Sequence, residues 1–91
     1  MGWAAARKLR RAVDGLARVL AIEIVTGCRA LDLRAPLEPA PVTGAVRDLV
    51  RGAGIAGPGP DRFVSPDVEA ATELVLSGAV AAASATPSIR A

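Results

Sequence analysis

Side chains that could carry out chemistry are few in this sequence. Its 91 residues include no His, Tyr, Asn or Gln, so acid–base chemistry could rest only on Asp, Glu, the one lysine Lys8 or the one cysteine Cys28. A single cysteine can form no internal disulfide and no cysteine-based zinc site, and it fits a reducing, cytoplasmic location. The sequence therefore predicts no catalytic, cofactor-binding or metal-binding residue in this chain.

Glu23 is the charge in the most unusual surroundings, because it lies inside the apolar run "VLAIEIV", residues 19–25. Burying it unpaired would cost several kcal/mol. Arg18 and Arg29 lie five and six residues away, outside the spacing of three or four at which helical neighbours touch. A catalytic carboxylate would need a second group that the chain lacks. We predict instead a cation on another helix or another subunit as its partner.

The stretch "GPGPDRFVSP", residues 57–66, is a glycine-rich loop before a helix start, an arrangement that can hold phosphate. Its three prolines remove backbone N–H donors, and no lysine follows the glycines as it does in a P-loop. Asp67 and Glu69 already occupy the anion position at the helix start. The loop is predicted to be a rigid connector.

The basic cluster "RKLRR", residues 7–11, raises the possibility of a nucleic-acid partner. On a helix these side chains spread around more than one turn, and no aromatic residue interleaves them for base stacking. We expect a solvated, ion-paired face and no nucleic-acid partner. We also expect no membrane partner, because residues 19–25 are too short a run to span a bilayer.

Helical periodicity dominates the first third of the chain and predicts one helix over residues 3–33, about 45 Å long. Its apolar stripe follows spacings of three and four residues and consists of Leu9, Val13, Leu16, Leu20, Ile24, Cys28 and Leu31. Arg10, Asp14 and Arg18 can pair along the opposite face. The run 19–25 is apolar nearly all round, so it requires more neighbouring helices than this chain supplies.

After the long helix, prolines 36, 39 and 41 predict an extended connector over residues 34–41. Two short helices are predicted next, over 42–51 and 65–77, with Ser65 as the N-cap of the second and Gly78 after its end. Cys28 is predicted to be a buried small apolar residue. The fold class is all-α, with a helical segment over residues 1–80 and a flexible tail over 81–91; Ala79 already belongs to the frayed end.

Three stretches together resemble the C-terminal end of bacterial histidine ammonia-lyase, a member of the aromatic amino acid ammonia-lyases. They are "MGWAAARKLRRAV", "LARVLAIEIVTGCRALDLRAPLEP" and "GPDRFVSPDVEAATELVLSGAV". The resemblance runs in order through about residue 80. It implies a large all-α helical bundle, usually a homotetramer in the cytoplasm, that eliminates ammonia from L-histidine to give urocanate.

The same resemblance implies that the chemistry lies outside this chain. The family forms its electrophile, a methylidene-imidazolone, from an Ala-Ser-Gly tripeptide, whereas the nearest match here is Leu76-Ser77-Gly78 at a predicted helix end. In this alignment Met1 follows a "QEDH"-type segment, so the active-site loops lie upstream. The chain is predicted to be inactive alone, with no cofactor of its own, and to have as partners the remainder of the lyase and sister subunits.

Two other interpretations stay open at this stage. The chain could be an independent helical module that oligomerises through the same apolar faces. It could also be the corresponding segment of a tyrosine or phenylalanine lyase or aminomutase, since the residues that select the substrate lie outside it.

Overall fold

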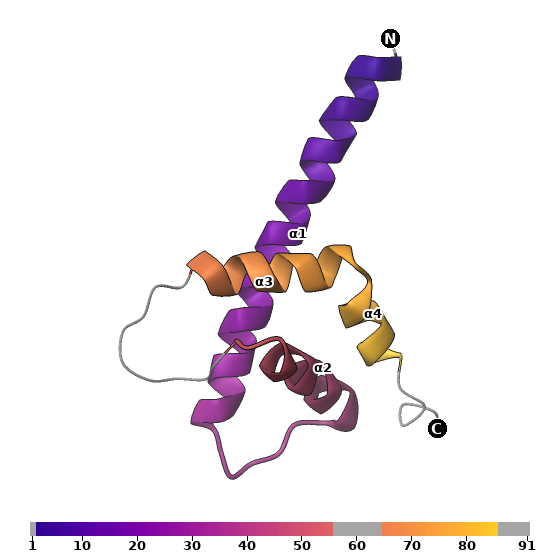
Figure 1. Ribbon diagram of the computed structural model, residues 1–91. Helices are drawn as coiled ribbons and strands as arrows, with labels where there is room; N and C mark the ends of the chain where they lie inside the picture. Colours follow the sequence, from indigo (N-terminus) through magenta and orange to yellow (C-terminus); the bar gives the residue numbers. More distant parts are fainter. Residues whose placement is uncertain (1, 56–64, 86–91) are drawn as a thin grey trace.

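Four helices make up the computed structural model, which describes residues 2–55 and 65–85. They are α1 (Gly2–Leu33), α2 (Pro41–Gly52), α3 (Ser65–Leu76) and α4 (Ala79–Ser84), and the described residues contain no strand. α3 crosses the middle of α1, α2 lies beside the C-terminal half of α1, and α4 packs against α2 and α3 (Figure 1). The all-α prediction is confirmed.

Helix α1 is continuous over 32 residues and therefore about 48 Å long. Its N-terminal half projects beyond α3 as an arm (Figure 1). The four buried residues of α1 all lie in the other half: Ala17, Ala21, Val25 and Cys28. The predicted helix is confirmed, but the buried face is turned from the predicted stripe, with which it shares only Cys28.

The connector after α1 ends where Pro41 begins α2, one residue earlier than predicted. Proline suits this first helical position because its fixed φ matches the helix and its missing N–H would have no partner there. After Gly52 the chain turns at Gly54, whose φ of +90° lies in the left-handed region that glycine adopts without strain. The turn brings Ile55 back beneath Val50, and both side chains are fully or almost fully buried.

The core lies where α1, the end of α2 and α3 meet. It consists of Ala21, Val25, Cys28, Val50, Ile55 and Ala71, with Ile24, Ala70 and Leu74 packed against it. The largest helix–helix contact joins α1 to α3, and the next joins α2 to α4. The core is small, and alanine makes up much of the α1–α3 crossing.

The C-terminal region differs from its prediction. A frayed end was expected from Ala79, but residues Ala79–Ser84 form α4, which packs against α2. Gly78 joins α3 to α4 with a φ of +85°. The sequence "AVAAAS" has a high intrinsic helix propensity but no marked apolar period. Periodicity therefore did not predict α4, and packing against α2 stabilises it. The proposed division between segment 1–80 and tail 81–91 stays a prediction.

Candidate functional site

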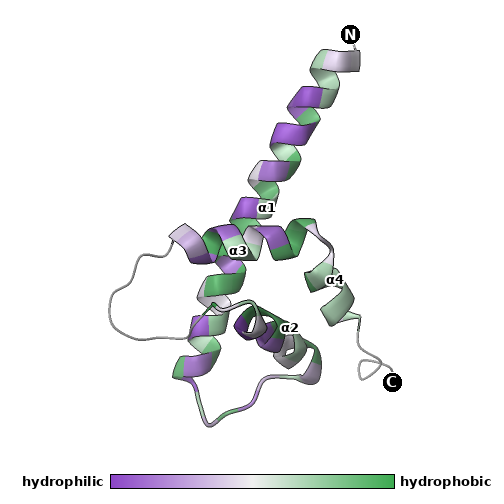
Figure 2. Ribbon diagram, viewed as in Figure 1, coloured by the Kyte–Doolittle hydropathy of each residue, from purple (hydrophilic) through white to green (hydrophobic). Residues whose placement is uncertain are grey.

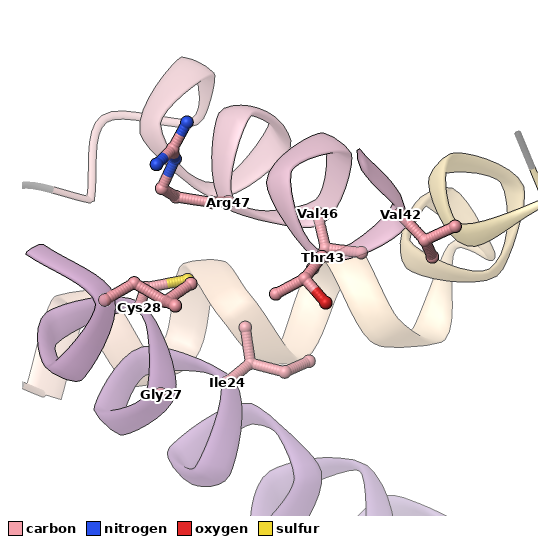
Figure 3. A pocket seen from close by; sticks show the side chains of 8 residues that line it. Ile24, Gly27, Cys28, Val42, Thr43, Val46 and Arg47 are labelled. Carbon is pink, nitrogen blue, oxygen red and sulfur yellow. The ribbon is translucent and has the colours of Figure 1, made fainter. Parts of the chain in front are cut away.

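An apolar cleft with a volume of about 410 Å³ lies between α1 and α2 (Figure 3). Its lining residues are Ile24, Gly27, Cys28 and Leu31 from α1, and Val42, Thr43, Val46 and Arg47 from the connector side of α2. Three of these carry a side-chain heteroatom, namely Cys28, Thr43 and Arg47. We call this space the α1–α2 cleft.

Cys28 carries the most reactive potential nucleophile in the cleft, and its environment opposes that role. The side chain is buried, and burial raises the pKa of its thiol above the ordinary value of 9.0, although Arg51 and Arg47 act in the opposite direction. A raised pKa keeps the thiol neutral at pH 7, whereas a nucleophile must be a thiolate. The predicted role of Cys28 as a buried small apolar residue is confirmed.

Below the cleft, Arg51 connects α2 to the end of α1. Its guanidinium forms an ion pair with Asp32 and its Nη1 donates a hydrogen bond of 2.7 Å to the carbonyl oxygen of Ile55. Both charged side chains are about three-quarters buried. This pair closes the turn that buries Ile55, so its role is structural. No local sequence pattern predicts this pair, because Asp32 and Arg51 lie on different helices.

A second ion pair joins α1 to α3. The Arg18 guanidinium donates to the Glu69 carboxylate, and this interaction raises the pKa of Arg18. Both side chains are more than half exposed. The sequence predicted that Arg18 pairs with Asp14 along α1. Asp14 acts on Arg18 only weakly, because α3 brings a closer carboxylate to it.

Glu23 lies on an exposed face of α1 and forms no ion pair with the other described residues. Its predicted burial against a cation is not reproduced within this single chain. Among its neighbours in the apolar run, Val19 and Ile22 are also about half exposed. The chain therefore buries Ala21 and Val25 of this run but leaves Val19 and Ile22 uncovered.

The tripeptide Leu76-Ser77-Gly78 lies at the end of α3, as predicted. The Ser77 hydroxyl donates a hydrogen bond of 3.1 Å to the carbonyl oxygen of Leu74, and it accepts one of 3.3 Å from the N–H of Ala79. The serine therefore stabilises a turn between two helices. Neither its sequence nor its position fits the Ala-Ser-Gly precursor of a methylidene-imidazolone.

The other predicted features bring no chemical groups together. Within the described residues, no three His, Cys, Asp or Glu side chains cluster as a metal site would require. None of the described helices is both long enough and apolar enough to cross a bilayer. The cluster at residues 7–11 lies exposed on the arm of α1, where hydrophilic and hydrophobic residues alternate (Figure 2). The glycine–proline loop, residues 57–64, lies outside the described residues.

Comparison with known proteins identifies the family. The aromatic amino acid lyase family model matches residues 1–52. The chain belongs to the aromatic amino acid lyase family. It is 55% identical to the histidine ammonia-lyase of Streptomyces coelicolor over 91% of its own length, and 42% identical to that of Mus musculus over 82%. The resemblance seen in the sequence is confirmed.

The matched region is a small part of these relatives. It corresponds to 16% of the Streptomyces coelicolor protein and 11% of the Mus musculus protein. No solved structure matches the chain significantly. Similarity to the curated relatives extends well past residue 52, where the family model ends, and therefore includes α3.

Proposed function

We propose that the chain is the C-terminal structural and assembly segment of a histidine ammonia-lyase, an enzyme of histidine catabolism that converts L-histidine to urocanate and ammonia. The observation that supports this most strongly is 55% identity over 91% of the chain combined with coverage of only 16% of the relative. The chain contains no His, Tyr, Asn or Gln. This composition supports a catalytic site formed by residues of the lyase outside this chain.

The remaining parts of this proposal follow from the same relationship. The partners are the rest of a lyase chain and sister subunits in a cytoplasmic homotetramer, within a large helical bundle. The methylidene-imidazolone is formed by residues outside this chain, because Leu76-Ser77-Gly78 does not fit its precursor. We propose histidine, and not tyrosine or phenylalanine, as the substrate of the complete enzyme, because the matched relatives are named histidine ammonia-lyases.

Complementation tests this role. The Streptomyces coelicolor histidine ammonia-lyase, truncated to remove the segment that matches this chain, is co-expressed with the chain or without it. We expect urocanate absorbance only from the co-expressed pair, because the chain supplies packing surface and the truncated enzyme supplies the chemistry. Urocanate produced by the chain alone, or no gain on co-expression, would contradict the proposal.

Glu23 distinguishes an assembly segment from an independent module. In a complete enzyme that carries this segment, Glu23→Ala would leave a buried cation unpaired, so the tetramer should weaken or its melting temperature fall. The rate of the chemical step should change little. If the chain instead functions as an independent helical module, the change should alter stability by less than about 0.5 kcal/mol. Sedimentation and thermal unfolding measure both effects.

A further inference from the structure

We draw no further inference here: the strongest candidate, the apolar α1–α2 cleft that Cys28, Thr43 and Arg47 line, carries no proposal because nothing in the structure shows what covers it in a chain that corresponds to only 16% of the Streptomyces coelicolor relative.

Discussion

The two halves of α1 belong to one uninterrupted helix but differ in how the rest of the chain covers them. In the C-terminal half, Ala17, Ala21, Val25 and Cys28 are buried beneath α3 and α2. In the arm, the larger Leu9, Val13 and Leu16 remain about half exposed or more. Within α1, the side chains that pack against the rest of the chain are therefore mostly smaller than those that the arm leaves exposed.

This difference has a steric reason. The separation of two packed helices depends on the size of the side chains at their contact. Ala21 and Ala71 are almost completely buried in the core where α1 meets α3, and their small size permits a close crossing. Larger apolar residues contribute more when buried, but they need holes in a facing helix to receive them. The arm has no such helix within this chain.

The difference between the two halves of α1 depends most on the packing of α1 against α3. Ala21 has no exposed surface, so Ala21→Asp would bury an unpaired carboxylate at the centre of the core. We expect the free energy of unfolding to fall by several kcal/mol, enough to detach α3. Urea unfolding followed by far-ultraviolet circular dichroism measures this. The control Ala4→Asp on the exposed arm should change stability little, and equal effects of the two changes would show that the halves do not differ.

A smaller effect is expected where α2 turns back onto the core. Ile55 is 2% exposed, so Ile55→Ala should leave a cavity and lower the free energy of unfolding by about 2–5 kcal/mol. Leu37→Ala, in the exposed connector, serves as the control and should cost less than about 0.5 kcal/mol. Thermal unfolding of both variants would refute the prediction if Leu37→Ala proved the more damaging.

The ion pair at the end of α1 should matter less than the core. Arg51→Met retains most of the aliphatic stem but removes the charge beside Asp32 and the hydrogen bond to Ile55. We expect a loss of about 1–3 kcal/mol, because a charged group with little exposure loses its partner. Asp32→Asn in the same background should then recover part of this loss. No recovery would mean that Asp32 is stabilised by solvent alone.

The smallest effect is expected at the exposed pair between Arg18 and Glu69. Solvent and salt screen this interaction, so Glu69→Gln should reduce stability less than Arg51→Met does. The difference from the parent chain should disappear as salt is raised. Thermal unfolding at low and high ionic strength tests this, and a loss that persisted in high salt would indicate a role beyond charge.

Much of the fold follows from local signals in the sequence. Strong periodicity predicts α1, and Pro41 and Gly54 lie where α2 begins and where the chain turns after it. The helix starting at Ser65 follows from its capping residues. In each case the residues that determine the element lie within it or next to it.

The features that the sequence did not predict arise from contacts between helices. The apolar periodicity predicted that large residues such as Leu16 form the buried face of α1. Instead α3 packs on the neighbouring face of Ala17 and Ala21, because small side chains permit a closer approach of the two helices. α4 forms through contact with α2, which no local pattern reveals. The partners of Arg18 and Arg51 could not be predicted, because each lies on another helix.

The ion pair between Arg18 and Glu69 also has a consequence for synthesis, because its members are 51 residues apart in the chain. At a translation rate of about 5–20 residues per second, the synthesis of these residues takes roughly 3–10 seconds, and α3 cannot cover α1 before it is complete. During this interval both faces of α1 are open to other nascent chains. A chaperone that recognises apolar helices would therefore meet the whole length of α1, and not just the arm that stays uncovered in the finished fold.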